Sequence, residues 1–546
     1  MSEEIQETKQ RKKFHISPAA WRCLEEGALY LGVLLITLFL FLFFKPYAKT
    51  TRAGIVAQTL MAVGLCACAA FVAYMGMSKR LTSKHIVLIF LVTGYIIRVG
   101  YMLYTSAATR QQDTYTKNFD GHEAYAWTIF QTGKLPTDNP YQFYHPPLNA
   151  MVQAGFMRFM DGLTKGFSEE FFLRYAYSMP DYVEPHRFFL YSTCQILATT
   201  YSFITAVVML KILKELGFTG KLYLFLAAFV VFYPRQIQFS GMLNNDGISY
   251  LLAIAALYFA LRWWKGGKSL VYILLCGLAV GLGMMAKLSS ATICIPIAGI
   301  FIYEFIRTLM KKEDALSLWQ MVLQYGLFLL VCAPIGLWFQ IYAYIRFDQP
   351  FGYVFDNLNR KLYTGHHSLF SRLIFTFDLS EHIGTLYCRP FSKNYNLFAY
   401  ALRSSIFGEF SYWQGEGFAA LSIFIAYTVS LLLLVALVYC AVFYFKKRKA
   451  GERISPLSHK ELLFAFLLVQ SQVLSEMYFY IKMPYGCTMD FRYIMPLILG
   501  LALTVGYTQK TLALAEGKFA SFLSKALYIG CTGLLVSSML FYCVCI

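Results

Sequence analysis

Three carboxylates and a histidine lie close together in the run Gln-Gln-Asp-Thr-Tyr-Thr-Lys-Asn-Phe-Asp-Gly-His-Glu, residues 111–123. Asp113, Asp120, His122 and Glu123 can each take or hold a proton, as a general base does when it activates a hydroxyl or an amine. The alternative is that these side chains simply face water, as acidic loop residues usually do. The cluster follows closely on an apolar run, so a base here can reach a group carried by a lipid.

A second candidate lies at the end of the same polar segment, in Tyr-Gln-Phe-Tyr-His-Pro-Pro-Leu, residues 141–148. The two prolines fix φ and lack backbone N–H donors, which predicts a rigid entry into a following helix. His145 precedes them directly and is a candidate catalytic or substrate-binding group. A structural histidine that caps the turn is the competing interpretation.

Two further charges stand near the ends of apolar runs. Asp246 closes the run Asn-Asn-Asp, which is also an ordinary turn and helix N-cap. Lys287 ends the run Met-Met-Ala-Lys, and an ionisable side chain at membrane depth is costly unless it has a function. A lysine that extends its ammonium to the membrane surface is the alternative. Arg235, which follows Pro234, is a weaker candidate of the same kind.

Three more ionisable residues lie late in the chain. Glu409 stands in Phe-Gly-Glu, and Asp490 and Arg492 stand in Met-Asp-Phe-Arg-Tyr. The planar guanidinium of Arg492 suits phosphate oxygens, which it can contact through two N–H donors. A salt bridge between Arg492 and Asp490 is a compatible alternative.

The composition indicates that these residues are held by a membrane bundle. Of the 546 residues, 58% are hydrophobic and only 14% are charged, whereas soluble domains have about 25% charged residues. The net charge of +18 comes from short basic clusters between apolar runs. That pattern sets orientation in a bilayer and argues against nucleic-acid binding. The first apolar run follows a basic stretch without a small-residue cleavage site, so we expect a retained first span.

Runs of about 20 apolar residues predict an all-α polytopic membrane protein of about thirteen spans. The expected spans are 26–45, 54–76, 86–104, 190–211, 220–234, 247–263, 269–286, 290–309, 318–345, 418–445, 460–481, 491–509 and 525–544. Basic residues concentrate in the N-terminal stretch and in alternate turns, for example Lys446-Lys447-Arg448-Lys449. We therefore expect the N-terminus in the cytoplasm and the C-terminus outside.

Two segments, 105–189 and 346–417, are too long for turns and fall outside in this topology. The stretches 167–177 and 370–377 within them resemble short helices that lie on the membrane surface. The expected organisation is residues 1–85 as N-terminus and two additional spans, 86–345 as a core that includes the first outer segment, 346–417 as the second outer segment, and 418–546 as the last spans. The candidate residues all fall on the outer face in this topology.

The ordered set of motifs resembles a known family. The acidic cluster, Gly-His-x-x-Tyr, Gln-Phe-Tyr-His-Pro-Pro-Leu, Asn-Asn-Asp, Lys-Leu-Ser, Phe-Gly-Glu and Phe-Arg-Tyr follow one another as in bacterial GT-C glycosyltransferases. These enzymes are relatives of protein O-mannosyltransferases and of the aminoarabinose transferase that acts on lipid A. The resemblance covers residues 86 to 500, and the two N-terminal spans precede the family core.

The resemblance implies a polyprenyl-phosphate-linked sugar as donor and inversion at the anomeric carbon. The acceptor, a lipid, glycan or protein of the cell envelope, would be modified on the extracytoplasmic face of the plasma membrane. Asp113 or Asp120 would be the general base, with Asp113 slightly favoured. The donor phosphate would be bound by Lys287, Arg492 and Arg235. Six further residues would bind the acceptor or orient the base: His122, Glu123, His145, Asp246, Glu409 and Asp490.

Two questions stay open at this point. No ligand spacing requires a metal, although Asp113, Asp246 and Glu409 could together hold a divalent cation. A transporter or flippase of lipid-linked sugars would share the spans and some of the membrane charges. Such a protein would not need long folded outer segments with clustered acids.

Overall fold

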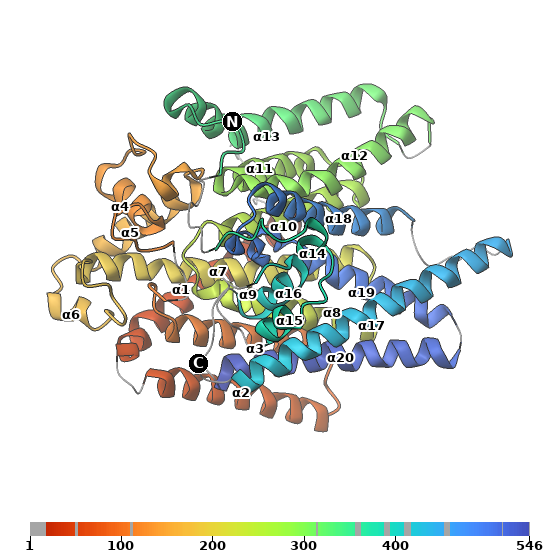
Figure 1. Cartoon of the computed structure of the whole chain (residues 1–546), viewed down its shortest axis with the longest axis horizontal. Helices are drawn as coiled ribbons and strands as arrows, with labels where there is room; N and C mark the ends of the chain where they lie inside the picture. Colours follow the sequence, from red (N-terminus) through yellow and green to blue (C-terminus); the bar gives the residue numbers. More distant parts are fainter. Residues whose placement is uncertain are drawn as a thin grey trace, which may run out of the picture.

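The computed structural model describes residues 18–49, 53–109, 113–312, 315–354, 362–386, 394–408, 416–451, 459–515 and 517–544. Its regular elements within these ranges are helices, and one isolated antiparallel bridge joins Tyr363 to Tyr485. Thirteen helices correspond to the predicted spans and form the bundle of Figure 1. They are α1 (Pro18–Phe44), α2 (Ala53–Met77), α3 (Ser83–Tyr104), α7 (Pro185–Glu215), α8 (Gly220–Phe232), α10 (Asp246–Lys265), α11 (Leu270–Ala286), α12 (Cys294–Leu309), α13 (Leu318–Phe347), α17 (Glu416–Lys449), α18 (His459–Lys482), α19 (Leu497–Leu514) and α20 (Lys518–Val544).

The predicted all-α polytopic class is confirmed, and the chain is an integral membrane protein. In the described residues, 11 helices are long and apolar enough to cross a membrane. Helix α8 continues into the short helices α9 (Pro234–Gln238) and η3 (Phe239–Gly241), which bend by 41° against it. Taken together they are long and apolar enough to count as a twelfth span, broken at the bend. The predicted span 269–286 corresponds to α11, an apolar helix of 17 residues.

Local sequence explains where several of these helices begin. Thr82 accepts a hydrogen bond from the backbone of His85 in a capping box that starts α3, and Ser317 with Gln320 does the same for α13. The bend after α8 falls at Pro234, which lacks the N–H that a continuous helix would use. The span predicted at 290–309 corresponds to Leu288–Leu309, whose first turns form the 3-10 helix η4 (Leu288–Ile293) ahead of α12. The span predicted from residue 491 begins later, at Leu497, because the 3-10 helix η8 (Phe491–Ile494) precedes α19.

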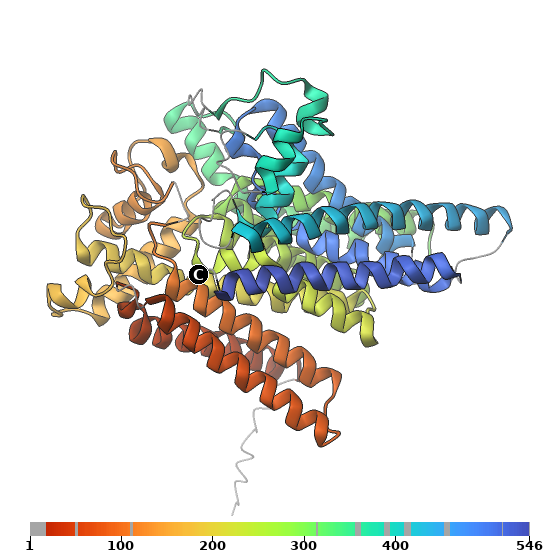
Figure 2. The same cartoon turned by 60° about the horizontal axis from the view of Figure 1, so that its bottom comes forward.

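The centre of the bundle is formed by α7, α10 and α19, with 78%, 67% and 72% of their most apolar windows buried. In α1 and α2 these shares are only 17% and 11%. Helix α10 packs between α7 and α11, α11 packs on α13, and α17 packs on α20. The two N-terminal spans therefore lie at the rim of the bundle (Figures 1 and 2), and most residues of their apolar windows are not buried within it.

Two long segments between the spans carry shorter helices. The first contains α4 (His122–Thr132), η2 (Tyr141–Tyr144), α5 (Leu148–Leu163) and α6 (Glu169–Leu173), in orange and yellow in Figure 2. The second contains α14 (Leu369–Leu373), α15 (Leu379–Leu386) and α16 (Leu397–Phe407), in teal. Helices α6 and α14 have only five residues each, shorter than the surface helices expected at 167–177 and 370–377. Both long segments contribute residues to one cavity.

Candidate active site

A cavity of about 410 Å³ lies between the first long segment, the second long segment and the ends of α11, α13 and α18. Its wall is largely polar and aromatic, with Tyr141, Tyr144, Tyr353, Tyr485 and Tyr493 among the lining residues. Of the residues singled out in the sequence, the cavity is lined by Asp113, His122, His145, Asp246, Lys287 and Arg492. These six come from four separate stretches of the chain, and the fold brings them together.

Asp113 is held at the cavity wall by its backbone and by its carboxylate. The N-terminus of α4 docks against it, because His122 N donates to Asp113 O at 2.9 Å and Glu123 N donates to Thr114 O at 3.1 Å. Gly121 makes this approach feasible, since a Cβ there would lie 2.5 Å from Thr114 O. The Tyr141 hydroxyl donates to Asp113 Oδ1 at 2.8 Å. The carboxylate keeps 27% of its exposure and can meet a ligand.

Two histidines lie beside this carboxylate. The rings of His122 and His145 stack with centroids 5.7 Å apart and planes 13° from parallel. Burial lowers the pKa of His122 to about 4, although the charge of Asp113 opposes the shift. Burial, reinforced by His122, lowers the pKa of His145 well below its ordinary range. Both imidazoles are therefore neutral near pH 7 and serve as hydrogen-bonding groups rather than as cations.

Lys287 and Asp246 form an ion pair at the inner part of the wall. Asp246 stands in the first turn of α10 and Lys287 is the C-cap of α11, so each charge also has the sign that the adjacent helix terminus favours. The Lys287 ammonium lies 4.6 Å from the centroid of the Tyr493 ring, a cation–π contact. The Lys287 side chain thus faces the cavity from a helix end. The alternative, a lysine that extends its ammonium to the membrane surface, does not describe this arrangement.

Arg492 stands on η8 and reaches toward Asp113. Its Nη2 lies 3.8 Å from Asp113 Oδ2 and donates to the Tyr493 hydroxyl at 3.0 Å. Its backbone N donates to Asp490 Oδ1 at 3.0 Å, which fixes the start of the turn that presents the guanidinium. The base candidate and a phosphate-binding candidate therefore share one cavity and approach each other closely.

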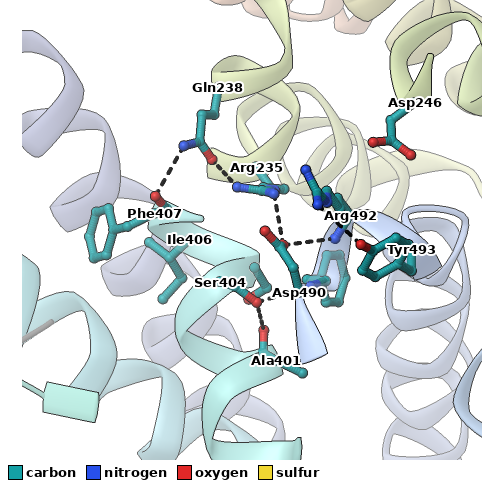
Figure 3. Close-up of polar contacts among 12 residues, drawn as sticks. Arg235, Gln238, Asp246, Ala401, Ser404, Ile406, Phe407, Asp490, Arg492 and Tyr493 are labelled. Carbon is teal, nitrogen blue, oxygen red and sulfur yellow. Dashed lines mark hydrogen bonds and ion pairs between the residues drawn. The ribbon is translucent and has the colours of Figure 1, made fainter. Parts of the chain in front are cut away.

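Asp490 and Arg235 form a pair behind this wall. Arg235 Nη2 lies 2.7 Å from Asp490 Oδ1, and both side chains are 1% exposed. Figure 3 shows the pair between α9 and η8, with Arg235 also bonded to Gln238, whose Nε2 donates to Phe407 O at 3.0 Å. Neither Arg235 nor Asp490 lines the cavity. Arg235 is instead the countercharge of the carboxylate that anchors the backbone of Arg492.

Gly408, at the end of α16, allows this pair to form. Its φ is +70°, a conformation that glycine adopts without strain. A Cβ at this position would lie 2.1 Å from Arg235 Nη1 and 2.7 Å from Gln238 Nε2. The end of the second long segment therefore rests directly on the guanidinium of Arg235.

The other sequence candidates lie elsewhere. Asp120 accepts a hydrogen bond from Thr116 Oγ1 at 2.6 Å within its own loop and does not line the cavity. Glu123 is buried and binds Arg187 of α7 through two contacts of 2.6 Å, with the Arg187 guanidinium also over the Phe119 and Trp127 rings. Glu409 lies outside the described residues.

Within the part of the chain that the structure describes, no three His, Cys, Asp or Glu side chains are grouped so that they could hold a metal ion. Asp113 and Asp246 are instead close to the cations Arg492 and Lys287. The described donor set therefore fits a phosphate with its counter-charges better than a divalent cation.

Sequence reasoning missed three residues of the wall: Tyr141, Tyr493 and Glu476. Tyr141 and Tyr493 belong to motifs in which only neighbouring residues, His145 and Arg492, were identified as candidates. Glu476 of α18 lines the cavity and is 3% exposed. A signal for it exists in the sequence, because an ionisable residue inside a predicted span is by default a functional candidate.

No protein-family model matches the sequence, and no curated protein matches it. Among solved structures, the chain is similar to the crystal structure of ArnT from Cupriavidus metallidurans bound to undecaprenyl phosphate. The identity is 13%, the match covers 78% of each chain, and the TM-score is 0.33. An overlay at this level assigns no role to any residue, so the chemistry of the cavity has to be argued from its own side chains.

Proposed function

We propose that this protein is an inverting glycosyltransferase that moves a sugar from a polyprenyl-phosphate donor to an acceptor on the extracytoplasmic face. The observation that carries the proposal is the shared cavity in which the Asp113 carboxylate lies 3.8 Å from the Arg492 guanidinium, with Lys287 in the same wall. A base beside two cations suits a reaction that removes a proton from one reactant and releases a phosphate from the other.

In the proposed reaction, Asp113 takes the proton of an acceptor hydroxyl or amine as that group attacks the anomeric carbon. The bond between the anomeric carbon and the phosphate oxygen breaks, and its electron pair stays on the polyprenyl phosphate. Attack from the side opposite the phosphate inverts the configuration. The leaving phosphate needs little protonation, because Arg492 and Lys287 stabilise the charge that develops on it.

The contacts support Asp113 over Asp120 as the base. Asp113 lines the cavity, receives a hydrogen bond from Tyr141 and retains exposure to a ligand. Asp120 is engaged by Thr116 in its own loop and lies outside the lining. A base must come within hydrogen-bond reach of the proton that it removes, and Asp113 has the more suitable position.

The remaining residues receive supporting roles in this proposal. Asp246 orients Lys287, and Asp490 with Arg235 holds the backbone of Arg492. His122 and His145, neutral and stacked in the wall, offer hydrogen bonds to the acceptor. The distribution of basic residues between the spans supports a cavity that faces away from the cytoplasm.

Reconstituted vesicles test the proposal directly. Radiolabelled polyprenyl-phosphate sugars are incubated with the wild type, Asp113→Asn and Asp120→Asn, and label is followed into acceptor and across the membrane. We expect transfer by the wild type and Asp120→Asn, and a loss on the order of 10²–10⁴-fold in Asp113→Asn, the range for removal of a general base. Transfer that survives in Asp113→Asn contradicts the assigned base. Label that crosses the membrane without transfer indicates a transporter.

A further inference from the structure

Part of the cavity wall is formed by α18, and this helix carries two buried side chains with acceptor oxygens on one face, Glu476 and Gln472. Glu476 and Gln472 are four residues apart, so their side chains lie one above the other on the helix. They are 3% and 0% exposed. Neither belongs to the base or to the cations of the proposed reaction.

Both side chains keep an oxygen without a protein partner. Among the described residues, Glu476 Oε1 and Gln472 Oε1 are buried and have no hydrogen-bond donor. The Gln472 amide is oriented, because its Nε2 donates to Thr292 Oγ1 at 3.0 Å and to Ser471 Oγ at 3.2 Å. A buried acceptor without a donor costs free energy, which a ligand that brings hydroxyl groups would recover.

Gln472 lines a small recess that adjoins the main cavity. This recess has a volume of about 20 Å³ and shares Asp246, Ser289, Thr292, Arg492 and Tyr493 with the lining of the main cavity. That volume holds about one water molecule, or one small polar group that enters from the main cavity. Glu476 lines the main cavity and lies one helical turn after Gln472 on the same face of α18.

Glu476 lies within a membrane span, whereas the proposed base lies outside the spans. It lies six residues before the end of α18 at Lys482, roughly 9 Å along the helix axis. Asp113, by contrast, belongs to the first long segment outside the spans. Lys287 and Arg492 line the same cavity as Glu476. The cations of the phosphate site thus neighbour this wall as well as Asp113.

A lipid-linked sugar has three parts, the polyprenyl chain, the phosphate and the sugar, and the acceptor oxygens of Glu476 and Gln472 do not suit all three equally. A polyprenyl chain has no hydrogen-bond donor to offer, and a phosphate would place negative oxygens against acceptor oxygens. Sugar hydroxyl groups supply donors and are small enough for the recess. We propose that Glu476 and Gln472 form the subsite for hydroxyl groups of the transferred sugar, with Glu476 as a specificity-determining residue. This inference rests on the proposed glycosyltransferase function.

The test compares two lipids that differ only by the sugar. Equilibrium binding to the full-length protein in nanodiscs is measured for undecaprenyl phosphate and for undecaprenyl phosphate that carries glucose, galactose, mannose or arabinose. The loaded lipid that the wild type binds most tightly is then used with Glu476→Leu and Glu476→Gln. Glu461→Gln is the matched control, because Glu461 lies on the same helix, pairs with Lys265 and does not line the cavity.

We expect Glu476→Leu to bind the loaded lipid at least about tenfold more weakly while its affinity for undecaprenyl phosphate stays within about twofold. Glu476→Gln keeps an acceptor oxygen and should lose less, and Glu461→Gln should bind both lipids as the wild type does. Retained binding of the sugar-free lipid shows that the variant is folded. An equal loss for both lipids, or no loss, overturns the subsite alone. A wild type that binds neither lipid overturns the proposed function as well.

Discussion

The Tyr141 hydroxyl donates a hydrogen bond of 2.8 Å to the Asp113 carboxylate, and the two residues lie on either side of α4 in the first long segment. Asp113 precedes α4, and Tyr141 begins η2 after it. The stretch around α4 therefore closes at the residue that we assign as the base, and the hydrogen bond limits the directions in which the Asp113 carboxylate can point.

Replacement of Tyr141 by Phe should lower kcat for sugar transfer while the protein stays folded. The variant keeps the ring and loses one hydrogen bond to a carboxylate, a contact worth about 1.5–3 kcal/mol. We expect kcat to fall by about tenfold or more, with a smaller change in the affinity for the donor. Steady-state kinetics in detergent or nanodiscs measures both. An unchanged kcat would show that Tyr141 does not position the base.

Two replacements of Arg492 distinguish the effect of its positive charge from the effect of its planar guanidinium. Lys keeps the positive charge but cannot donate both to Tyr493 and toward the cavity as the planar guanidinium does. Loss of an electrostatic donor to a developing charge typically costs about 10²–10³-fold in kcat. We expect Arg492→Gln to lose activity in this range and Arg492→Lys to lose less. Equal activity of Arg492→Lys and the wild type would contradict a role for the guanidinium geometry.

The buried pair of Arg235 and Asp490 should be sensitive to single changes. Removal of one partner leaves a charge that is 1% exposed without its countercharge, which costs about 3–5 kcal/mol. We expect Arg235→Met and Asp490→Leu each to lower the thermal unfolding temperature. The double variant should be less unstable than the sum of the single variants. Additive effects would mean that the pair is not coupled.

The contact between Glu123 and Arg187 should control how firmly the first long segment is held on α7. Glu123 is buried, and both its oxygens bind the guanidinium at 2.6 Å. We expect Glu123→Gln to increase hydrogen exchange in α4 and to reduce transfer, because α4 carries the docking contact of Asp113. The control is Glu170→Gln, which breaks a pair with Arg174 that is mostly exposed and should change neither. Equal exchange in α4 of the wild type and Glu123→Gln would contradict this role.

The low pKa of His122 predicts a pH dependence of stability. Burial lowers this pKa from its ordinary 6.5 to about 4, so the unfolded chain binds a proton more readily between these values. The contribution of neutral His122 is therefore fully present above pH 6.5 and is lost as the pH falls toward 4. We expect the unfolding temperature of the wild type to decline over this range more steeply than that of His122→Gln. Parallel curves would contradict a buried neutral imidazole.

The membrane architecture could be predicted because apolar runs of span length are a strong and local signal. Each of the thirteen expected spans corresponds to a helix, and the shortest, 220–234, is the one that the structure bends at Pro234. Ahead of α19, Pro496 follows the 3-10 turn Phe491–Ile494, and apolar residues continue through this stretch. The start of that span was therefore placed several residues too early.

The site could be predicted only in part, since its contacts join residues far apart in the sequence. Asp113 and Asp120 have equivalent local surroundings, and only the fold shows that one faces the cavity and the other bonds to Thr116. The sequence offered Asp490 as an alternative partner for the Arg492 side chain, and the structure pairs the Asp490 carboxylate with Arg235, 255 positions away. Glu476 was overlooked because it sits in a span that was identified for its apolar residues.

The absence of a side chain at Gly408 links three distant positions of the chain. A Cβ there would collide with the Arg235 guanidinium, and Arg235 in turn neutralises Asp490. A mutation at residue 408 alone would displace the Arg235 guanidinium and leave the Asp490 carboxylate without its countercharge. A residue with a Cβ at 408 would also strain the backbone, because glycine alone adopts the φ of +70° without cost. Relatives that keep the Arg235–Asp490 pair should therefore keep glycine at 408.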